Sequence, residues 1–376
     1  MRNFYSVLLV LFVMISCSQT KTTGGQPAAI SNVDTILVGT YTSDSSQGIY
    51  ALEFERETGA IKNMGLVAEA VNPSFLVEGT EGDILYSVNE VGQGGISAFK
   101  WNRQLGEYSL LNHVSSEGAS PCHVSISNHK DVLSSSNYQS GNVVFYAINS
   151  DGSLADSVEV RQNEGETGPD KRQDRAHAHC GIFGKNDQYL YVVDLGLDKI
   201  VAYKVDSSGK PMSSHTAMKL DPGDGPRHLI FHPTLDMAFV INELSSTMVS
   251  MSVDHTTGTF KRIDKKSTLP EGFNGTNYCA DLHMTANGKF LYGSNRGHNS
   301  IVVFEVSETG ELSFLEVEST RGSWPRNFSI SPDEKHLLVA NQKTNNVTVF
   351  EIDKESGLLE FTGNEAKVFS PTCLIF

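Results

Sequence analysis

Seven stretches of the chain share one pattern of apolar and polar positions. Each is an apolar run that ends in a small polar residue, followed by a polar turn and then by a strand in which apolar and polar residues alternate. Alternation with a period of two is the pattern of a half-buried β-strand. The residues that end the seven apolar runs are Thr40, Asn89, Asn137, Asp194, Asn242, Asn295 and Asn341. The chain therefore contains seven copies of one unit of two strands.

A second short piece recurs ahead of six of these units, as NPSFLV, SPCHVSI, HAHCGIF, GPRHLIF, YCADLHM and WPRNFSI. The units follow one another at roughly 50 residues, which is the period of propeller blades built from four antiparallel strands. Period-two strands exclude a solenoid of helical repeats. The sequence thus predicts an all-β fold, a seven-bladed β-propeller.

The seventh copy of the short piece, SPTCLIF, lies at the C-terminus, whereas its partner ILVGTYT stands near the start of the repeat region. We therefore expect the C-terminal strand to complete the first blade. Closure of this kind leaves no exposed sheet edge and joins the two ends of the domain.

The N-terminus has the features of a lipoprotein signal. Arg2 is followed by an apolar run over residues 4–15, too short to cross a bilayer, and then by Ser16-Cys17. We expect a signal peptide over 1–16, a flexible Ser-, Thr-, Gly- and Pro-rich tether over 17–33 with an acylated Cys17, and the propeller over 34–376. This predicts an exported protein of the bacterial cell envelope that meets the membrane only through its lipid anchor.

The formal net charge of −15 argues against nucleic acid as a partner, and any anionic ligand needs cations placed locally. Nothing in the sequence indicates a protein partner. Besides Cys17 the chain has four widely spaced cysteines, which favour buried free thiols and leave one disulfide possible. They are Cys122, Cys180, Cys279 and Cys373.

Candidate site residues are sought where equivalent positions of the blades carry different polar side chains. One such position follows the repeated Asn or Asp and holds Tyr41, Glu90, Tyr138, Leu195, Glu243, Arg296 and Gln342. The other lies in the inner strand and is read as Phe75, His123, His179, His228, Asp281, Asn327 and Cys373, preceded in two blades by Arg227 and Arg326. Because charged residues are rarely buried without partners, we expect these side chains to converge on one mouth of the central channel.

Two of these features also have purely structural interpretations. The repeated Asn and Asp residues are expected to serve as turn or inter-strand hydrogen-bonding groups. Glu243 and Arg227 alternatively form an inter-blade ion pair.

At these residues the chain resembles the lactonase family of seven-bladed propellers, which includes one class of bacterial 6-phosphogluconolactonase and the fungal carboxy-muconate lactonizing enzyme. The resemblance covers nearly the whole chain after the signal. Its carriers are GTYTS, NPSFL, HAH with DLGLDKI, GPRHLIFHP, INE, SNRGHNSI and WPRNFSISPDEKHLLVANQ. It implies a four-residue active site that falls on His179, Arg227, Glu243 and Arg296.

The resemblance implies hydrolysis of a small anionic lactone. In that reaction we expect Glu243 or His179 to be the general base, and Arg227 with Arg296 to bind the oxyanion or a substrate anion. Secondary substrate contacts are expected from His228, His123, Arg326 and Asn327.

Three alternatives remain. A metal held by His123, His179 and His228 is disfavoured by the neighbouring arginines, so no metal is expected. Cyclisation of a muconate-type acid uses the same residues. A non-catalytic propeller that binds a sugar acid, a glycan or a protein at the envelope needs no base, although fold alone does not decide function. The absence of a phosphate-binding Gly loop implies no nucleotide cofactor.

Overall fold

The computed structural model describes residue 1 and residues 32–42, 45–79, 82–129 and 131–376. The predicted signal peptide, the acylated Cys17 and nearly all of the predicted tether lie outside the described residues. Residues 32–376 form one compact unit. No helix in the described ranges is long and apolar enough to cross a membrane.

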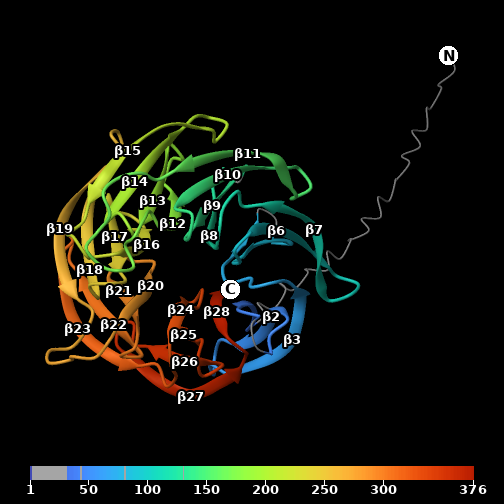
Figure 1. Cartoon of the computed structure of the whole chain (residues 1–376). Helices are drawn as coiled ribbons and strands as arrows, with labels where there is room; N and C mark the ends of the chain where they lie inside the picture. The colour runs from blue at the N-terminus through green and yellow to red at the C-terminus, as the bar shows by residue number, and fades with distance from the viewer. Residues whose placement is uncertain (2–31, 43–44, 80–81, 130) are drawn as a thin grey trace. The chain divides into compact units, whose positions relative to one another are not determined.

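Residues 32–376 form seven four-stranded antiparallel sheets arranged as the blades of a ring (Figure 1), so the predicted all-β propeller is confirmed. The first blade contains, from the inside outward, β28 (Pro371–Ile375), β1 (Val33–Thr40), β2 (Gly48–Glu55) and β3 (Ile61–Glu69). The second and third blades contain β4 (Leu76–Glu78), β5 (Ile84–Asn89), β6 (Gly95–Asn102), β7 (Glu107–Ser115), β8 (Pro121–Ile126), β9 (Val132–Asn137), β10 (Asn142–Ile148) and β11 (Leu154–Gln162).

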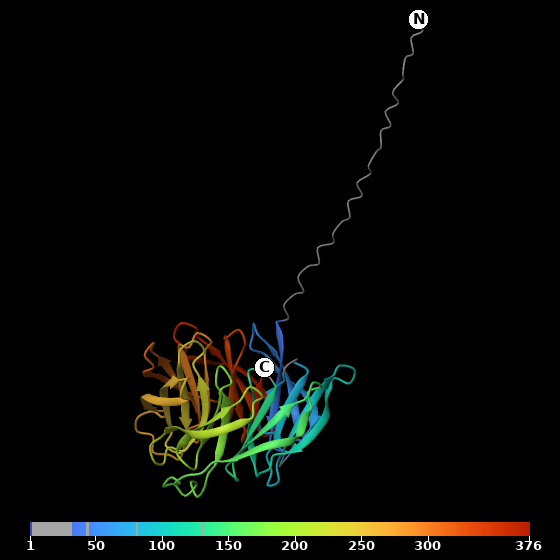
Figure 2. The ribbon, with the colours of Figure 1, turned by 90° about the horizontal axis from the view of Figure 1, so that it is seen from above.

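The remaining blades repeat this order, and their strands run between the two faces of the ring (Figure 2). The fourth and fifth contain β12 (Ala178–Phe183), β13 (Tyr189–Asp194), β14 (Lys199–Val205), β15 (Pro211–Lys219), β16 (Pro226–Phe231), β17 (Met237–Asn242), β18 (Thr247–Asp254) and β19 (Thr259–Ser267). The sixth and seventh contain β20 (Tyr278–Met284), β21 (Phe290–Arg296), β22 (Ser300–Val306), β23 (Leu312–Ser319), β24 (Pro325–Ile330), β25 (His336–Asn341), β26 (Asn346–Ile352) and β27 (Leu359–Lys367).

The C-terminal strand closes the ring as expected. β28 pairs antiparallel with β1, with Val38 opposite Leu374 and Gly39 opposite Cys373. Gly39 is required here, because a Cβ at this position would lie 2.4 Å from the carbonyl oxygen of Pro73 in the second blade. The seam between first and last strand is thus also a close contact between blades.

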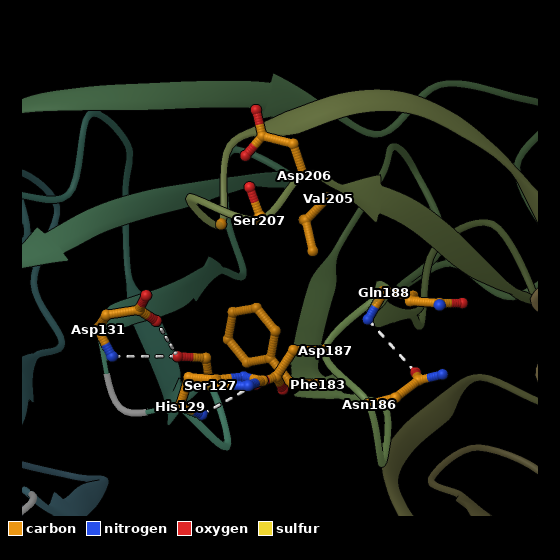
Figure 3. A pocket seen from close by; sticks show the side chains of 11 residues that line it. Ser127, His129, Asp131, Phe183, Asn186, Asp187, Gln188, Val205, Asp206 and Ser207 are labelled. Atoms are coloured by element: carbon orange, nitrogen blue, oxygen red, sulfur yellow. Dashed lines mark hydrogen bonds and ion pairs between the residues drawn. The ribbon is translucent and has the colours of Figure 1, made fainter.

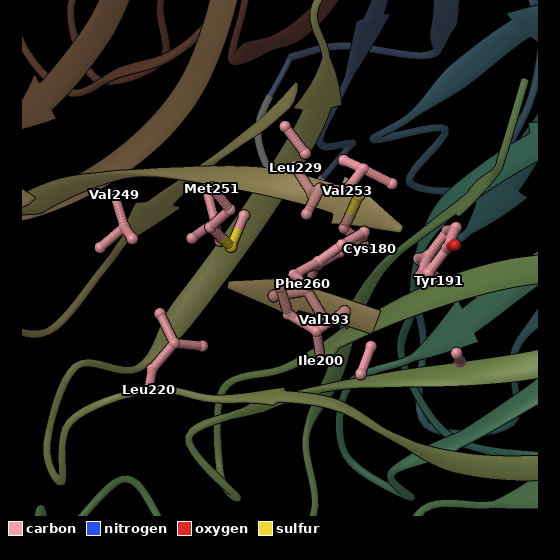
Figure 4. Close-up of a cluster of buried hydrophobic side chains, with 14 of the residues drawn as sticks. Cys180, Tyr191, Val193, Ile200, Leu220, Leu229, Val249, Met251, Val253 and Phe260 are labelled. Carbon is pink, nitrogen blue, oxygen red and sulfur yellow. The ribbon is translucent and has the colours of Figure 1, made fainter. Parts of the chain in front are cut away.

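Apolar side chains from facing sheets fill the spaces between blades. Between the fourth and fifth blades the cluster includes Tyr191, Val193, Leu229, Met251 and Phe260 (Figure 4). The rings of Tyr191 and Phe260 stack at 4.6 Å. Each fully buried side chain of this kind contributes about 1.5–3 kcal/mol. Each sheet has a neighbouring blade on both faces. The apolar residues of its strands are therefore buried between blades, which favours this fold.

Four of the five repeated Asn residues donate to the preceding blade, and Asn242 donates to Thr247 in its own blade, which confirms their structural interpretation. The Nδ2 atoms of Asn137 and Asn295 donate to the carbonyl oxygens of Ser116 (2.7 Å) and Thr268 (2.8 Å). Both acceptors directly follow the outer strand of the preceding blade. Asp194 reverses the polarity and accepts from Asn163.

The four cysteines beyond residue 32 are buried free thiols, as expected, and none of them forms a disulfide in the described part of the chain.

Candidate active site

A β-bulge near the start of the inner strands sets the directions of the channel-lining side chains. The unpaired residue is Cys122 in β8, His179 in β12, Arg227 in β16, Arg326 in β24 and Thr372 in β28. Bulges re-aim side chains beside many active sites. We call the end of the channel at which the inner strands begin the upper mouth. These five residues, with Ser74 and Ala280, are the upper ring. The next residues along each strand form the lower ring, which is Phe75, His123, Cys180, His228, Asp281, Asn327 and Cys373.

The expected position of His179 is wrong by one residue. Ala178 pairs with Asp194 and Cys180 pairs with Val193, so His179 takes the bulge position that Arg227 takes in β16. The equivalent of His228 is Cys180. β12 has an alanine at the position where most inner strands have proline. The sequence pattern was matched at the histidines instead, so the displacement of His179 by one residue was not apparent.

The centre of the upper site is the buried carboxylate of Glu243, which directly follows β17 and is 3% exposed. Its Oε2 lies 2.9 Å from Arg296 Nη2, and its Oε1 lies 2.5 Å from Arg172 Nη1. Arg227 Nε lies 3.0 Å from Oε2 without aiming its N–H along that line, so this contact is an ion pair rather than a directed hydrogen bond.

The three guanidinium groups decide the charge state of Glu243. Burial alone would raise the pKa of its carboxyl, but the charges of Arg296, Arg227 and Arg172 outweigh burial and bring the pKa to about 2. Glu243 is therefore ionised at neutral pH and holds a proton poorly.

Backbone carbonyl groups fix the two buried arginines. Arg227 Nη1 donates to the carbonyl oxygen of Ala280 at 2.7 Å, and Arg296 Nη2 donates to that of Cys279 at 2.9 Å. Both acceptors belong to β20, so the sixth blade orients a side chain from the fifth and one of its own.

Arg172 is the member of this cluster that the sequence pattern did not reveal. It lies in residues 163–177, the longest connection between blades, and donates to Tyr138 Oη at 2.9 Å as well as to Glu243. Gln173 anchors the segment through hydrogen bonds to Leu195 O and Asp198 Oδ1. The available signal was the departure from the repeat length together with the charged run PDKRQDR.

A second polar cluster lies on the opposite side of the upper mouth. Arg326 Nη2 donates to Tyr41 Oη at 2.7 Å, and Tyr41 Oη donates to Glu90 Oε2 at 2.8 Å. The hydroxyl of Ser74 also donates to Glu90. The two clusters together contain four guanidinium groups and two carboxylates, which leaves a local excess of positive charge in an acidic protein.

The lower ring contains a buried carboxylate shared by two histidines. Asp281 Oδ1 lies 2.7 Å from His228 Nδ1, and Asp281 Oδ2 lies 3.0 Å from His283 Nε2. Asn327 Nδ2 donates to the same Oδ2 at 2.5 Å. Burial lowers the pKa of His228 to about 4; the charge of Arg227 acts in the same direction and Asp281 opposes it.

The structure brings together three of the four principal site residues, Arg227, Glu243 and Arg296. His179 makes no ion pair with Glu243 in the described structure; its Nδ1 lies 3.8 Å from Cys122 Sγ, and its ring centroid lies 5.4 Å from that of His228. The expected secondary contacts divide between two levels. Arg326 lies in the upper ring, whereas His123, His228 and Asn327 lie in the lower ring.

The histidines do not form a metal site within the described ranges, where no group of three or more His, Cys, Asp or Glu side chains has a suitable arrangement. His123 packs against the ring of Phe75 at 4.4 Å, and His228 is engaged by Asp281.

Half-exposed aromatic rings surround the upper mouth. The guanidinium carbon of Arg172 lies 5.3 Å from the ring centroid of Tyr278, and that of Arg296 lies 5.5 Å from the ring centroid of Trp324. Lys343 Nζ lies 3.4 Å from the centroid of Trp324. Aromatic faces, guanidinium groups and hydroxyl groups together suit a small polar ring that carries a negative charge.

A cavity of about 360 Å³ lies away from the channel, between turns of the third and fourth blades (Figure 3). Its most buried carboxylate, Asp187, accepts hydrogen bonds from the backbone N–H groups of Asn128 and His129. With its carboxylate satisfied and no arginine in its lining, it lacks the chemistry of the upper mouth.

Fold and site together define a seven-bladed propeller with a cationic, carboxylate-centred pocket at one mouth of its channel. The chain belongs to the lactonase family of seven-bladed β-propellers, whose family model matches residues 35–376. The resemblance inferred from the sequence motifs is thereby confirmed.

Relatives of known name and structure cover nearly the same residues. The 6-phosphogluconolactonase of Bacillus subtilis is 39% identical over 342 residues, which are 90% of this chain and 97% of that protein. The crystal structure of a Lactobacillus plantarum protein has 34% identity and a TM-score of 0.85 and covers 91% of this chain and 98% of its own. The periplasmic gluconolactonase of Pseudomonas aeruginosa has 32% identity and a TM-score of 0.85, with 92% and 99% covered. The expected lactonase-type hydrolase is confirmed at the level of the family.

Proposed function

We propose that the chain hydrolyses the lactone of a sugar acid bound at the upper mouth of the channel. The observation that carries this proposal is the convergence of Arg172, Arg227, Arg296 and Arg326 on one mouth of a protein with a formal charge of −15. Local cations of this kind attract an anion to the mouth although the net charge of the protein is negative.

Arginines suit the two charges that the reaction presents. A planar guanidinium binds a carboxylate or phosphate of the substrate through two parallel hydrogen bonds. The same groups stabilise the oxyanion that forms when water adds to the lactone carbonyl, and loss of one such donor typically costs about 10²–10³ in kcat.

For Glu243 we propose a positioning role in place of the general-base role expected from the sequence. A carboxylate with a pKa of about 2 is a weak general base near neutral pH. Its contacts instead support a positioning role, in which one negative charge holds three guanidinium groups close together. A neutral histidine is better suited to accept the proton of water.

The names of the relatives and the predicted export signal together favour one class of lactone as the substrate. The Bacillus subtilis relative is named for 6-phosphogluconolactone and the Pseudomonas aeruginosa relative for a periplasmic activity on gluconolactone. With the predicted export signal and lipid anchor at Cys17, these names favour an unphosphorylated sugar lactone met in the cell envelope, because phosphorylated sugars are intracellular metabolites.

The test is a hydrolysis assay of the purified protein with gluconolactone and 6-phosphogluconolactone, followed by proton release and corrected for spontaneous opening. We expect turnover that the double variant Glu243→Gln, Arg227→Ala loses. Near wild-type rates in that variant contradict the proposed site. Tight binding of a sugar acid with no turnover of either lactone indicates a binding protein instead.

A further inference from the structure

A small cavity lies between the upper and the lower ring, directly below the arginines. It has about 10 Å³ of room for the centre of a water molecule, close to the least that holds one water. Its polar walls are Ser74, Thr372, Arg227, Arg326, His228 and Asn327. A water there contacts polar groups on most sides, as buried waters normally do.

Thr372 points independently to a ligand in this cavity. Its side chain is 2% exposed, and its Oγ1 is buried with no hydrogen-bond partner among the described residues. Buried hydroxyl groups are nearly always hydrogen-bonded, to protein or to an ordered water. A water in the cavity that Thr372 lines supplies the missing partner.

His228 presents a lone pair at the same place. Because the Asp281 carboxylate accepts from Nδ1 at 2.7 Å, the proton of the neutral imidazole resides on Nδ1 and Nε2 is the basic atom. Nε2 accepts from Arg227 Nη1 at 3.0 Å. A general-base role requires Nε2 to exchange this hydrogen bond for one from a water in the cavity, while Arg227 Nη1 keeps its bond to the carbonyl oxygen of Ala280.

The other two candidate bases are less well placed. Neither Glu243 nor His179 lines this cavity. Glu243 is surrounded by three guanidinium groups, and His179 Nδ1 is nearest to a thiol rather than to a carboxylate that would orient it. A base oriented by a carboxylate is the arrangement that recurs in hydrolases.

We infer that the cavity holds the hydrolytic water, bound by the Thr372 hydroxyl, and that His228, oriented by Asp281, is the general base. This inference rests on the proposed lactone hydrolysis. His228 Nε2 takes a proton from the water as the water oxygen bonds to the carbonyl carbon of the lactone. The π electrons of that carbonyl move to its oxygen, which faces the arginines. Collapse breaks the bond to the ring oxygen, which takes the proton back from His228. The product is the hydroxy acid.

The charged and titratable groups around His228 set the pH dependence. They are Arg227 on its own strand, Asp281 and His283 on β20, Arg326 on β24, His123 and Cys122 on β8, His179 and Cys180 on β12, and Cys373 on β28. Their net effect with burial keeps His228 neutral above pH about 4. Asp281 raises the pKa of His228, so its removal moves the acid limb of kcat to lower pH.

The experiment compares Asp281→Asn, Thr372→Val and Thr372→Ser in full-length protein with the lactone that the wild type hydrolyses. For Asp281→Asn we expect kcat to fall about 10²–10⁴-fold, the usual contribution of a general base, with KM within threefold. The acid limb of the dependence of kcat on pH should shift to lower pH. Thr372→Val should lower kcat about tenfold, and Thr372→Ser should restore most of it, because one hydrogen bond to the water is lost and regained.

Asp187→Asn is the matched control. Asp187 lies 2.7 Å from His129 Nδ1, the same separation as in the His228 pair, but at the outer cavity of Figure 3. Its kcat should equal that of the wild type. Folded Asp281→Asn and Thr372→Val proteins with kcat within twofold of wild type overturn the inference. If Asp281→Asn does not fold, the two Thr372 variants decide. A wild type that hydrolyses no lactone refutes the proposed function instead.

Discussion

Arg172 Nη1 lies 2.5 Å from Glu243 Oε1, so a loop between the third and fourth blades meets the end of a strand in the fifth. The sequence separation is 71 residues. The loop thus completes the cation cluster from the rim of the mouth, and Arg172 remains partly exposed there.

Arg172→Ala is expected to lower kcat/KM about 10- to 100-fold, the range for a lost hydrogen bond of ~1.5–3 kcal/mol to a charged group. Most of the effect should appear in KM if Arg172 binds the substrate anion. Steady-state kinetics decide this, with Arg175→Ala on the same loop as the control, because Arg175 pairs with the exposed Asp174 rather than with Glu243. Equal kinetics for the two variants would contradict a binding role.

Glu243→Gln is expected to destabilise the fold by ~3–5 kcal/mol, because it leaves buried guanidinium groups without their counter-charge. Urea unfolding at pH 7 measures this. The comparison variant is Glu318→Gln, whose carboxylate pairs with Arg321 at the surface. An exposed pair of this kind contributes about 0–1 kcal/mol, so a similar loss in both variants would rule out a special role for the buried cluster.

Acid should weaken the wild-type protein in two windows. The pKa of His228 falls from 6.5 to about 4 on folding, so the unfolded chain binds more protons between these values and stability drops as pH falls through them. The pKa of Glu243 falls from 4.5 to about 2, and the stability it contributes above 4.5 is lost as pH falls toward 2. Unfolding free energies measured against pH should depend less steeply on pH in the lower window in Glu243→Gln, where Asp281, whose pKa is also lowered, still titrates. An unchanged profile in that variant would contradict the assigned pKa.

Removal of residues 371–376 should abolish cooperative melting, because β1 then lacks its inner partner and buried Leu374 and Cys373 are lost. Calorimetry with wild type and with a variant lacking residues 1–31, which precede the first strand of the ring, provides the comparison. A single sharp transition near the wild-type temperature in the C-terminal truncation would show that the seam is dispensable.

The sequence revealed the blades because packing between sheets requires the same apolar alternation in each copy, and because a small polar residue, Asn in five of the seven copies, ends each apolar run. Arg227, Glu243 and Arg296 were visible as departures from that repetition. Arg172 was not, since it lies on a loop without counterparts in other blades. The position of His179 was misjudged because it was treated as equivalent to His228, whereas His179 is the bulge residue of β12 and Cys180 is the equivalent of His228.

Pairing across blades was beyond the reach of the sequence as well. His228 and Asp281 belong to neighbouring blades and are 53 residues apart, and no local pattern links them. Which nitrogen of His228 carries the proton follows only from that contact.

The closing strand also couples the mechanical integrity of the ring to the proposed chemistry. β28 pairs with β1 and brings Thr372 to the wall of the cavity below the arginines. A change that loosens the seam between these two strands therefore disturbs the inferred water-binding site at the same time as the ring.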